Sequence, residues 1–480
     1  MNRPIAHVFG LVALLFALLI AWTSRWTVFS AKALRENALN ARGLIEQERI
    51  PRGEILASDG TVLARSHRGA GAVYTRHYPT ADLFAHAVGY AYIGPGESGL
   101  ELSANGYLTG TTSRSDLTRI IDQLQGIQPA GDTVVSTLDP KAQAVAANAL
   151  AGYRGAVVAL DPHTGAVRVM ASSPSFDPNA LGGRGAFARL NAQANAPLVN
   201  RATEFGYAPG STFKLVTATA AINSGHFSPS SVVSGKDGVV VSGTPLHNDD
   251  DQSYGDISLT TALEYSVNTV WAQVAEQVGK ATMAQYMQRF GFDSTPPLDY
   301  PSSEMTPSGE YEGGHILSPT SPLVDVGRMG IGQDKLEVTP LQMAEVVATL
   351  ANHGTEMRPY LIAQVVDPDG STIDRTAPQV QSVVMSPSTA SAIRSMMEAV
   401  VAGGTGTAAQ IPGVTVAGKT GTAETQIGNT INNVWFVAFA PADNPTVAIA
   451  VTVQDVPGFG GGIAAPIAKR VMEALGVGGT

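Results

Sequence analysis

The sequence predicts an α/β fold built on an antiparallel sheet. Two strand pairs support this, one near residues 155–173 and one near residues 434–455, because each has two apolar segments around a polar turn. Most of the sequence between these pairs has helical spacing. Strand pairs at both ends of a mostly helical stretch indicate one sheet that is completed by segments far apart in the chain.

The composition is that of a globular protein, with 44% hydrophobic and 15% charged residues, and 480 residues are enough for more than one domain. The formal net charge of -10 argues against a nucleic-acid partner. The chain has no Cys, which excludes disulfides, thiol redox chemistry and metal sites built on Cys.

The first element is an apolar stretch from Ile5 to Trp22, interrupted only by His7. About 20 apolar residues cross a bilayer, and Trp22 and Trp26 are suited to the interface at the far end. A cleaved signal peptide is the alternative, but no A-x-A-like site follows the stretch. We therefore expect a retained transmembrane helix over residues 1–26.

A second part, residues 27–135, is expected to form a separate N-terminal domain. Its first residues have the spacing and mixed charge of a stalk helix. Two β-prone runs then flank Ser58-Asp59-Gly60, which is a typical hairpin signal. From about Gly69 to Ala130 the sequence is polar and interrupted by glycines, so no hydrophobic core can be predicted from it.

The third part, residues 136–480, contains the predicted sheet. A strand over residues 132–139 leads into it, and a helix follows with Pro140 in its first turn. Residues 465–477 form the last predicted helix. The stretch from Phe292 to Pro319 is rich in Pro, Ser and Gly and is expected to be an extended surface loop.

The first candidate for chemistry is "PGSTFK", which places Ser211 at a helix start and Lys214 three residues later. Residues three apart lie on one face of a helix, so the Lys214 amine can reach the Ser211 hydroxyl and take its proton. The free N–H at a helix start suits an oxyanion hole. Taken alone, the pattern equally describes a serine N-cap followed by a chance lysine.

Ser266-Val267-Asn268 forms a second candidate at a break between two helical runs. A hydroxyl can relay a proton and an amide can hold a substrate carbonyl. Without other information, an ordinary corner between helices explains these residues as well.

The third candidate is Lys419-Thr420-Gly421-Thr422, after the β-prone "GVTV". A lysine and two hydroxyls suit a carboxylate, and Gly421 permits close approach of a ligand to a strand edge. A strand N–H near Thr422 is a candidate for the second oxyanion donor. A nearby Lys419 ammonium would also lower the pKa of Lys214, which must be partly neutral to act as a base.

The three motifs occur in the order Ser-x-x-Lys, Ser-x-Asn and Lys-Thr-Gly, and together they resemble those of the penicillin-recognising serine enzymes. The flanking sequence resembles class B penicillin-binding proteins, the monofunctional peptidoglycan transpeptidases, and is most similar to the actinobacterial penicillin-binding protein A type. This resemblance rests on "PRGEILASDGTVLA", "GPGESGLE", "GIGQDKLEVTPLQMAEVVATLANHG" and "GGTGTAAQIPGVTVAGKTGTAE", and it covers essentially the whole chain.

The sequence departs from the family at three places. Ala57 and Ser58 stand where the family usually has Asp and Arg, which puts a local salt bridge in doubt. Asp334 stands where Gly is commoner.

The resemblance implies an antiparallel sheet sandwiched by helices, set on an elongated and mostly β N-terminal pedestal, with no metal or cofactor. It implies that Ser211 attacks a D-Ala-D-Ala stem peptide with Lys214 as base, that Ser266 passes a proton to the leaving group, and that Asn268 binds the donor peptide. Lys419, Thr420, Gly421 and Thr422 would hold the terminal carboxylate. An amine would then resolve the acyl-enzyme, β-lactams would acylate Ser211, and the catalytic domain would lie outside the cytoplasmic membrane.

Three alternatives remain at this point. A D,D-carboxypeptidase or β-lactamase would share the motifs, although no water-activating base can be identified. A scaffold of the division or elongation machinery, recruiting a glycosyltransferase, would use the same anchor and pedestal. A metal site at His247–Asp251 is the third, but consecutive acids are more typical of a solvated turn.

Overall fold

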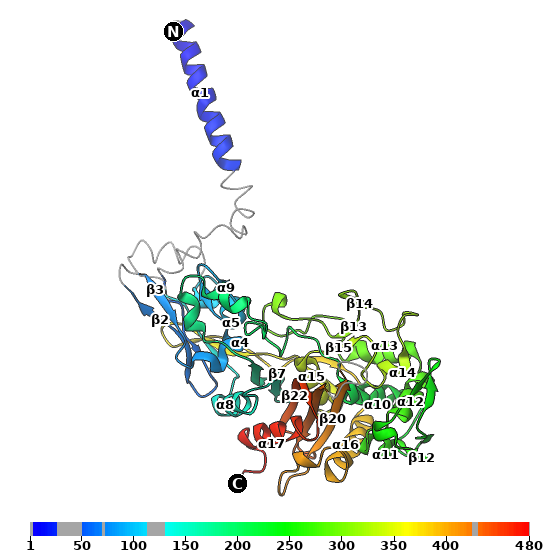
Figure 1. Ribbon diagram of the computed structural model, residues 1–480. Coiled ribbons are helices and arrows are strands. Elements are labelled where there is room, and N and C mark those ends of the chain that lie inside the picture. Colours follow the sequence, from blue (N-terminus) through cyan, green and yellow to red (C-terminus); the bar gives the residue numbers. More distant parts are fainter. Residues whose placement is uncertain (1–2, 26–49, 70–72, 113–129, 425–430, 480) are drawn as a thin grey trace.

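The computed structural model describes residues 3–25, 50–69, 73–112, 130–424 and 431–479. The stalk helix expected after the membrane segment lies outside the described residues. Figure 1 shows a separate N-terminal helix and a body in which the N-terminal strands lie beside a larger α/β part.

The N-terminal helix α1 spans Arg3–Ser24, within the predicted transmembrane segment. Its window His7–Ser24 has a mean hydropathy of 2.0, and none of that window is buried against the rest of the protein. The helix is therefore long and apolar enough to cross a membrane, as the sequence predicts.

The pedestal is a six-stranded sheet in the order β18-β17-β6-β1-β2-β3. The predicted hairpin forms at its centre, where β1 and β2 pair antiparallel and the Asp59 carboxylate accepts a hydrogen bond from the Thr61 N–H. The strands from this part of the chain are β1 (Ile55–Leu56), β2 (Val62–Arg68), β3 (Tyr74–His77) and β6 (Thr133–Ser136).

Short elements after β3 give the pedestal a core that the sequence does not reveal, because apolar residues there are scattered rather than periodic. Phe84, Val88, Leu100 and Leu108 are all fully or almost fully buried. The elements are η3 (Ala81–Phe84), α4 (Ala85–Val88), β4 (Ala91–Tyr92), β5 (Gly96–Glu97), α5 (Gly99–Ser103) and α6 (Asn105–Leu108).

Two pedestal strands come from much later in the chain. β17 (Ile362–Val366) pairs antiparallel with β6, and β18 (Thr372–Arg375) extends the sheet beyond it. The Asp299 carboxylate accepts hydrogen bonds from the N–H groups of Leu361 and Ile362 and so holds the entry to β17. One continuous sheet therefore includes strands from both predicted domains.

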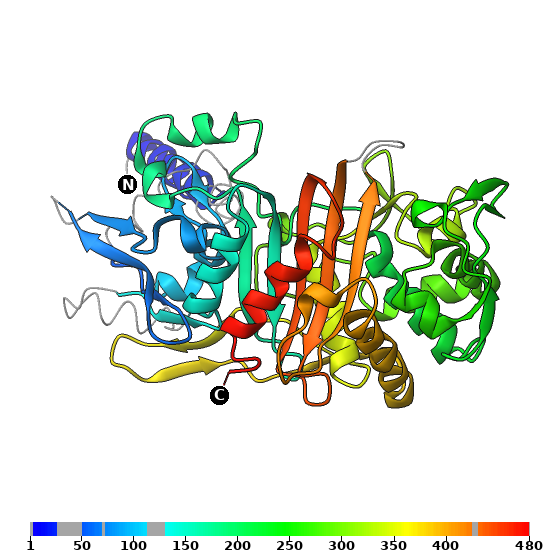
Figure 2. The same cartoon turned by 60° about the horizontal axis from the view of Figure 1, so that its bottom comes forward.

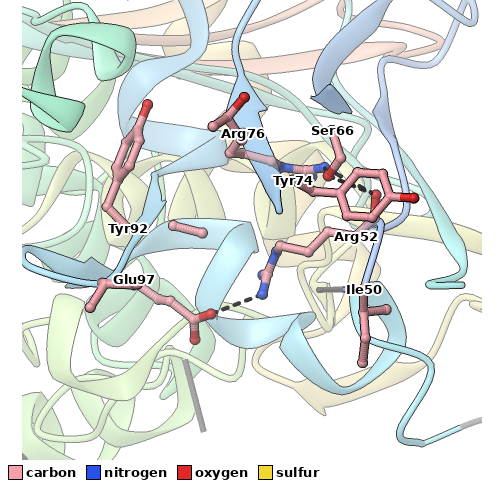
Figure 3. Close-up of a pocket in the computed structure, with 10 residues that line it drawn as sticks. Ile50, Arg52, Ser66, Tyr74, Arg76, Tyr92 and Glu97 are labelled. Carbon is pink, nitrogen blue, oxygen red and sulfur yellow. Dashed lines mark hydrogen bonds and ion pairs between the residues drawn. The ribbon is translucent and has the colours of Figure 1, made fainter. Parts of the chain in front are cut away.

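The two pedestal motifs meet in an ion-pair network. Figure 3 shows the ion pair of Arg52 with Glu97. Arg52 and Arg76 also both bind the fully buried Glu101, each at a different carboxylate oxygen. Burial raises the pKa of Glu101, but Arg76 and Arg52 outweigh this, so that its pKa is lowered. Gly53 lies beside the network, where its carbonyl accepts a hydrogen bond from Arg76. A glycine is required there because a Cβ would overlap the Asp132 carbonyl.

The larger part is built on a five-stranded antiparallel sheet in the order β20-β21-β22-β7-β8, which confirms the predicted sheet. The predicted turn at residues 161–165 joins two of these strands, with Asp161 accepting from the N–H groups of His163 and Thr164. The strands are β7 (Arg154–Leu160), β8 (Val167–Ser173), β20 (Ala417–Glu424), β21 (Ile431–Ala440) and β22 (Val447–Pro457).

Helices cover both faces of this sheet. α15 (Pro340–Ala351) packs on one face, while α8 (Pro140–Ala149) and α17 (Ala464–Ala474) pack on the other, where Figure 2 shows α17 in red across the strands. Alternate residues of β21 enter the two cores: Trp435 faces one and Phe436 the other. This burial on both faces explains why β21 is continuously apolar from Val434 to Ala440.

A mostly helical region lies beyond the β20 edge and carries two of the three motifs. Its helices are η5 (Gly210–Phe213), α10 (Lys214–Asn223), α11 (Leu259–Glu264), α12 (Asn268–Val278), α13 (Lys280–Arg289), α14 (Val326–Met329) and α16 (Pro387–Ala402). Its small sheets contain β9 (Val232–Ser234), β10 (Val239–Val241), β11 (Thr244–Leu246), β12 (Asp256–Ser258), β16 (Thr355–Met357) and β19 (Val380–Val383).

Two local predictions are wrong. The stretch Phe292–Pro319 is not simply a surface loop, because Tyr300 and Met305 are buried and β13 (Gly309–Glu312) pairs there with β14 (His315–Leu317) and β15 (Leu336–Glu337). The structure of this stretch depends on contacts with distant segments, which cannot be predicted from its amino-acid composition. "GVTV" is also not a continuous strand, since β20 begins only at Ala417.

Candidate active site

The three motifs converge at the β20 edge of the five-stranded sheet. Ser211 lies in η5, Ser266 lies in the break between α11 and α12, and Lys419 lies in β20. The η5 turn contacts β20 directly, and the Trp435 indole N–H donates to the Ala208 carbonyl at 3.0 Å. The sheet edge and the serine-bearing turn are therefore held together by the core.

The approach between the turn and the strand requires two glycines. A Cβ on Gly421 would come within 2.7 Å of the Pro209 carbonyl oxygen, and Gly210 has a positive φ of 51° and faces the Thr422 carbonyl. The sequence suggested that Gly421 makes room for a ligand. In the structure, it makes room for the Ser211 turn.

Ser211 is partly exposed in the first turn of a 3-10 helix. It does not act as a side-chain cap, and its hydroxyl makes no hydrogen bond within the described part of the chain. The hydroxyl oxygen of Ser211 is therefore free to react. The backbone N–H groups at the start of a helix lack intrahelical partners, and an oxyanion role for the Ser211 N–H stays a prediction.

Lys214 is fully buried, but its amine points to the second motif rather than to Ser211. Its Nζ donates to the Ser266 carbonyl at 2.6 Å and to the Asn268 Oδ1 at 2.7 Å, and it lies 3.3 Å from the Ser266 Oγ. The sequence predicts that the Lys214 amine reaches the Ser211 hydroxyl, but no hydrogen bond joins them among the described residues, and the amine binds Ser266 and Asn268 instead. The role of Lys214 as base stays a prediction.

Ser266 lies between the two lysines. Its Oγ accepts a hydrogen bond from the Lys419 Nζ at 2.9 Å, besides the longer contact with Lys214. The residue has a left-handed φ of 61°, a conformation that costs free energy outside glycine. Strain at this position is consistent with a side chain held for function rather than for helix formation.

The third motif surrounds Lys419 with oxygen atoms. Its buried amine also donates to the Thr420 carbonyl at 2.9 Å. The Thr420 hydroxyl is 2.6 Å from the hydroxyl of Thr405, a residue that the sequence analysis did not single out. Thr422 accepts a long hydrogen bond of 3.4 Å from the Gly460 N–H. Lys419, Thr420 and Thr422 thus present an ammonium and two hydroxyls along one strand edge.

Both lysines have lowered pKa values. Burial lowers the pKa of Lys214 well below its usual range, and the neighbouring Lys419 ammonium lowers it further, as the sequence predicts. Burial also lowers the pKa of Lys419 to about 7. A neutral Lys214 beside a partly charged Lys419 is therefore accessible near neutral pH.

Asn268 begins α12 and is fixed by the loop at residues 247–251. Asn248 accepts hydrogen bonds from the N–H and hydroxyl of Thr269, which caps the helix start. The Asn268 Nδ2 lies 3.4 Å from both the His247 carbonyl and the Asp249 carboxylate. The sequence analysis treated this loop as a solvated turn and missed its contact with the active site.

The sequence analysis considered a metal site at His247–Asp251. Two residues of that segment, His247 and Asp251, do come together with Asp237, and the ligand atoms of all three lie within 4.8 Å of one another. His247 binds both carboxylates, at 2.9 Å to Asp237 and 3.2 Å to Asp251. These bonds already satisfy the cluster, and nothing further indicates an ion.

A serine exposed on a helical turn, a second serine between two buried lysines and a lysine-bearing sheet edge define a penicillin-recognising serine acyltransferase. Residues 155–473 match the penicillin binding protein transpeptidase domain, and residues 52–134 match the penicillin binding protein A dimerisation domain. The chain belongs to the penicillin-binding protein transpeptidase family.

Relatives of this chain are similar over their full length. It is 34% identical to "Peptidoglycan D,D-transpeptidase PbpA" of Mycolicibacterium smegmatis and 33% identical to that of Mycobacterium tuberculosis H37Rv, covering 99% of each chain in both comparisons. The solved ceftriaxone acyl-enzyme of M. tuberculosis penicillin-binding protein A superposes with a TM-score of 0.81 at 32% identity, covering 90% of this chain and 99% of that one.

Proposed function

We propose that this protein is a peptidoglycan D,D-transpeptidase that crosslinks stem peptides through an acyl-enzyme on Ser211. The observation that carries the proposal is the position of Ser266, whose Oγ contacts the amines of both Lys214 and Lys419. The relatives named as D,D-transpeptidases and the β-lactam acyl-enzymes among the similar structures support it.

Acylation follows from the charges of the two lysines. The neutral Lys214 amine takes the proton of the Ser211 hydroxyl as Oγ attacks the carbonyl of the penultimate D-Ala. Ser266 passes a proton to the leaving D-Ala amine. Lys419, Thr420 and Thr422 bind the terminal carboxylate at the strand edge, while Gly421 keeps the strand close to the Ser211 turn. Asn268 contacts the donor peptide.

The second half of the reaction distinguishes a transpeptidase from a hydrolase of the same fold. An acceptor amine attacks the acyl carbon, a C–N bond forms, and the C–O bond to Ser211 breaks. No carboxylate forms a hydrogen bond with Ser211 among the described residues. Rapid turnover of penicillin would contradict transpeptidation and favour the β-lactamase alternative, whereas a persistent acyl-enzyme supports it.

The cellular location follows from the proposed substrate. The substrate lies in the cell wall, so we propose that α1 anchors the chain in the cytoplasmic membrane with residues 27–480 outside. Residues 27–135 would form the pedestal domain and residues 136–480 the transpeptidase domain. A glycan-polymerising glycosyltransferase of the division or elongation machinery is the proposed partner of the pedestal.

A fluorescent penicillin and peptide mapping test the site. We expect a single adduct on Ser211, which Ser211→Ala abolishes. Lys214→Ala should slow acylation by about 10²–10⁴-fold, the contribution of a positioned base. Ser175→Ala is a matched control, since Ser175 donates only to the Asp82 carbonyl, in the pedestal. An adduct on another residue would refute the assignment of the nucleophile.

A complementation assay separates catalysis from a scaffold role. We expect Ser211→Ala to fail to support growth in a strain that depends on this protein. Full rescue by this variant would show that binding to other proteins, rather than acyl transfer, is the essential function.

A further inference from the structure

The Asp249 carboxylate lies beside Asn268 of the second motif. Its Oδ1 is 3.4 Å from the Asn268 Nδ2, while the Asn268 Oδ1 accepts from the Lys214 Nζ at 2.7 Å. One amide side chain therefore separates Asp249 from the proposed base. Asp249 is exposed, so a molecule that enters from solvent can reach its carboxylate.

The other acids of this loop are differently placed. Asp237 and Asp251 are both bound to His247, and Asp250 is exposed and makes no contact with Asn268. Asp249 forms no ion pair with any described residue. Its carboxylate thus keeps free acceptor capacity directed at the catalytic residues, rather than at its own loop.

The charge of Asp249 also reaches both catalytic lysines. Burial lowers the pKa of Lys214 and of Lys419, and the charge of Asp249 opposes that effect at each. Among the carboxylates that the structure describes, Asp249 alone acts on both amines in this way. It is the negative charge that an incoming cation would meet at this centre.

The chemistry of the second substrate requires such a charge. A side-chain amine of an acceptor stem peptide is protonated near pH 7, as lysine is. This ammonium approaches a centre in which Lys419 is partly charged near pH 7, and like charges repel at short range. Water, which competes for the acyl-enzyme, carries no charge and experiences no such repulsion.

We propose that Asp249 binds the ammonium of the acceptor substrate and so favours aminolysis of the acyl-enzyme over hydrolysis. This inference rests on the proposed transpeptidase function. The ammonium docks on Asp249 and loses one proton to solvent, and the neutral nitrogen then attacks the acyl carbon. As the C–N bond forms, the C–O bond to Ser211 breaks, and the second proton passes through Lys214 to the Ser211 oxygen.

The test measures how the acyl-enzyme partitions between amine and water. The full-length protein in detergent is acylated with an N-acyl-D-alanyl thioester in the presence of Nα-acetyl-D-lysine amide, and both products are quantified by mass spectrometry. We expect Asp249→Asn to reduce the ratio of aminolysis to hydrolysis about 5- to 30-fold, equivalent to one or two kcal/mol. The ratio does not depend on the rate of acylation.

Two controls separate substrate binding from a structural role. Asp250→Asn removes a neighbouring charge of the same loop and should leave the ratio within about twofold of wild type, since surface substitutions have small effects. Hydroxylamine, which is uncharged near pH 7, should give the same partition ratio with Asp249→Asn as with the wild type.

The outcomes are distinct. A ratio unchanged in Asp249→Asn, an equal loss with hydroxylamine, an equal loss in Asp250→Asn, or a wild type that gives no aminolysis would each overturn the assignment of Asp249. The same preparations are labelled with fluorescent penicillin. Loss of the Ser211 adduct in the wild type would instead overturn the proposed function itself.

Discussion

At the scale of residues, the site depends on two buried lysines that share one hydroxyl. Burial lowers the pKa of both lysines, and the Lys419 ammonium lowers the pKa of Lys214 further, so the centre does not hold two full positive charges at neutral pH. Their partners differ: Lys214 contacts the carbonyl of Ser266 and the amide of Asn268, whereas Lys419 lies on the strand edge. This asymmetry supports the proposed roles of Lys214 as the base and of Lys419 in binding the substrate carboxylate.

The pH dependence of acylation should report Lys419. Its pKa is about 7, so raising the pH through 7 removes the charge that binds the substrate carboxylate. We expect the second-order rate of acylation by benzylpenicillin to fall on the alkaline side with a midpoint near pH 7. Lys419→Arg stays charged and should move this limb to higher pH. An alkaline limb that is unchanged in Lys419→Arg would assign it to another group.

The sequence predicted which residues meet here, but not all of their contacts. The order and spacing of the three motifs indicated Ser211, Ser266 and Lys419 because those residue types have complementary chemistry. The hydrogen bonds of Lys214 could not be predicted, since they depend on the position of the Ser266 carbonyl. Asp249 was missed because a run of acids has the same pattern in a solvated turn as beside an active site.

At the scale of elements, the site depends on how closely the Ser211 turn approaches β20. A Cβ at Gly421 would lie 2.7 Å from the Pro209 carbonyl oxygen and 2.9 Å from the Thr212 Cγ2. We expect Gly421→Ala to displace the turn and to slow acylation by about 10²-fold, the cost of a 1 Å misplacement. Stopped-flow acylation with a chromogenic cephalosporin measures this rate.

Gly462→Ala is the matched control for that experiment. Gly462 follows β22 near the same strand edge, and an added Cβ would have no neighbour closer than 3.7 Å. Its acylation rate should stay close to wild type. If both variants are equally slow, the close approach at Gly421 is not the cause.

In the pedestal, the elements are joined by the buried Glu101, which lies between two arginines. Breaking such a pair leaves an uncompensated buried charge and costs about 3–5 kcal/mol. We expect Glu101→Gln to lower the thermal unfolding midpoint and to expose the pedestal to proteolysis. Arg65→Gln is the control, since Arg65 is exposed on the neighbouring β2. Equal midpoints for Glu101→Gln and the wild type would contradict a stabilising network.

Elements were predicted best where the local signal was strong. The Asp59-Gly60 hairpin, the Pro140 helix and the strands around residues 161–165 follow from turn chemistry and capping, which act within a few residues. The interior of Phe292–Pro319 was not predicted, because Tyr300 and Met305 are buried only through contacts with distant segments. The membership of β17 and β18 in the pedestal sheet has the same explanation.

At the scale of the whole molecule, a pair of buried glutamates couples stability to pH. Glu345 in α15 is fully buried, and burial together with the charge of Glu356 raises its pKa well above the usual range. Burial raises the pKa of Glu356 to about 7. Between about pH 4.5 and 7, the two carboxyl groups stay protonated in the folded state, whereas they lose their protons in the unfolded chain. The free energy of unfolding should therefore fall as the pH rises from about 4.5 through 7.

Replacement of Glu345 tests this coupling. We expect Glu345→Gln to be about 1–3 kcal/mol more stable relative to wild type at pH 8 than at pH 5, since a pKa shift of one unit corresponds to about 1.4 kcal/mol. Denaturant unfolding at the two pH values measures the difference. Glu473→Gln on the exposed face of α17 should show no such dependence. A pH-independent effect of Glu345→Gln would argue against a raised pKa of Glu345 in the folded state.

The shared pedestal sheet has a consequence for the order in which the protein can fold. β6 emerges early in synthesis, but its partner β17 is made more than two hundred residues later. Until then, the nascent chain has an unpaired strand edge, which is a template for association with other chains. The pedestal sheet is therefore complete only after most of the polypeptide has been made, and a chain that stops before Ile362 would leave this edge open.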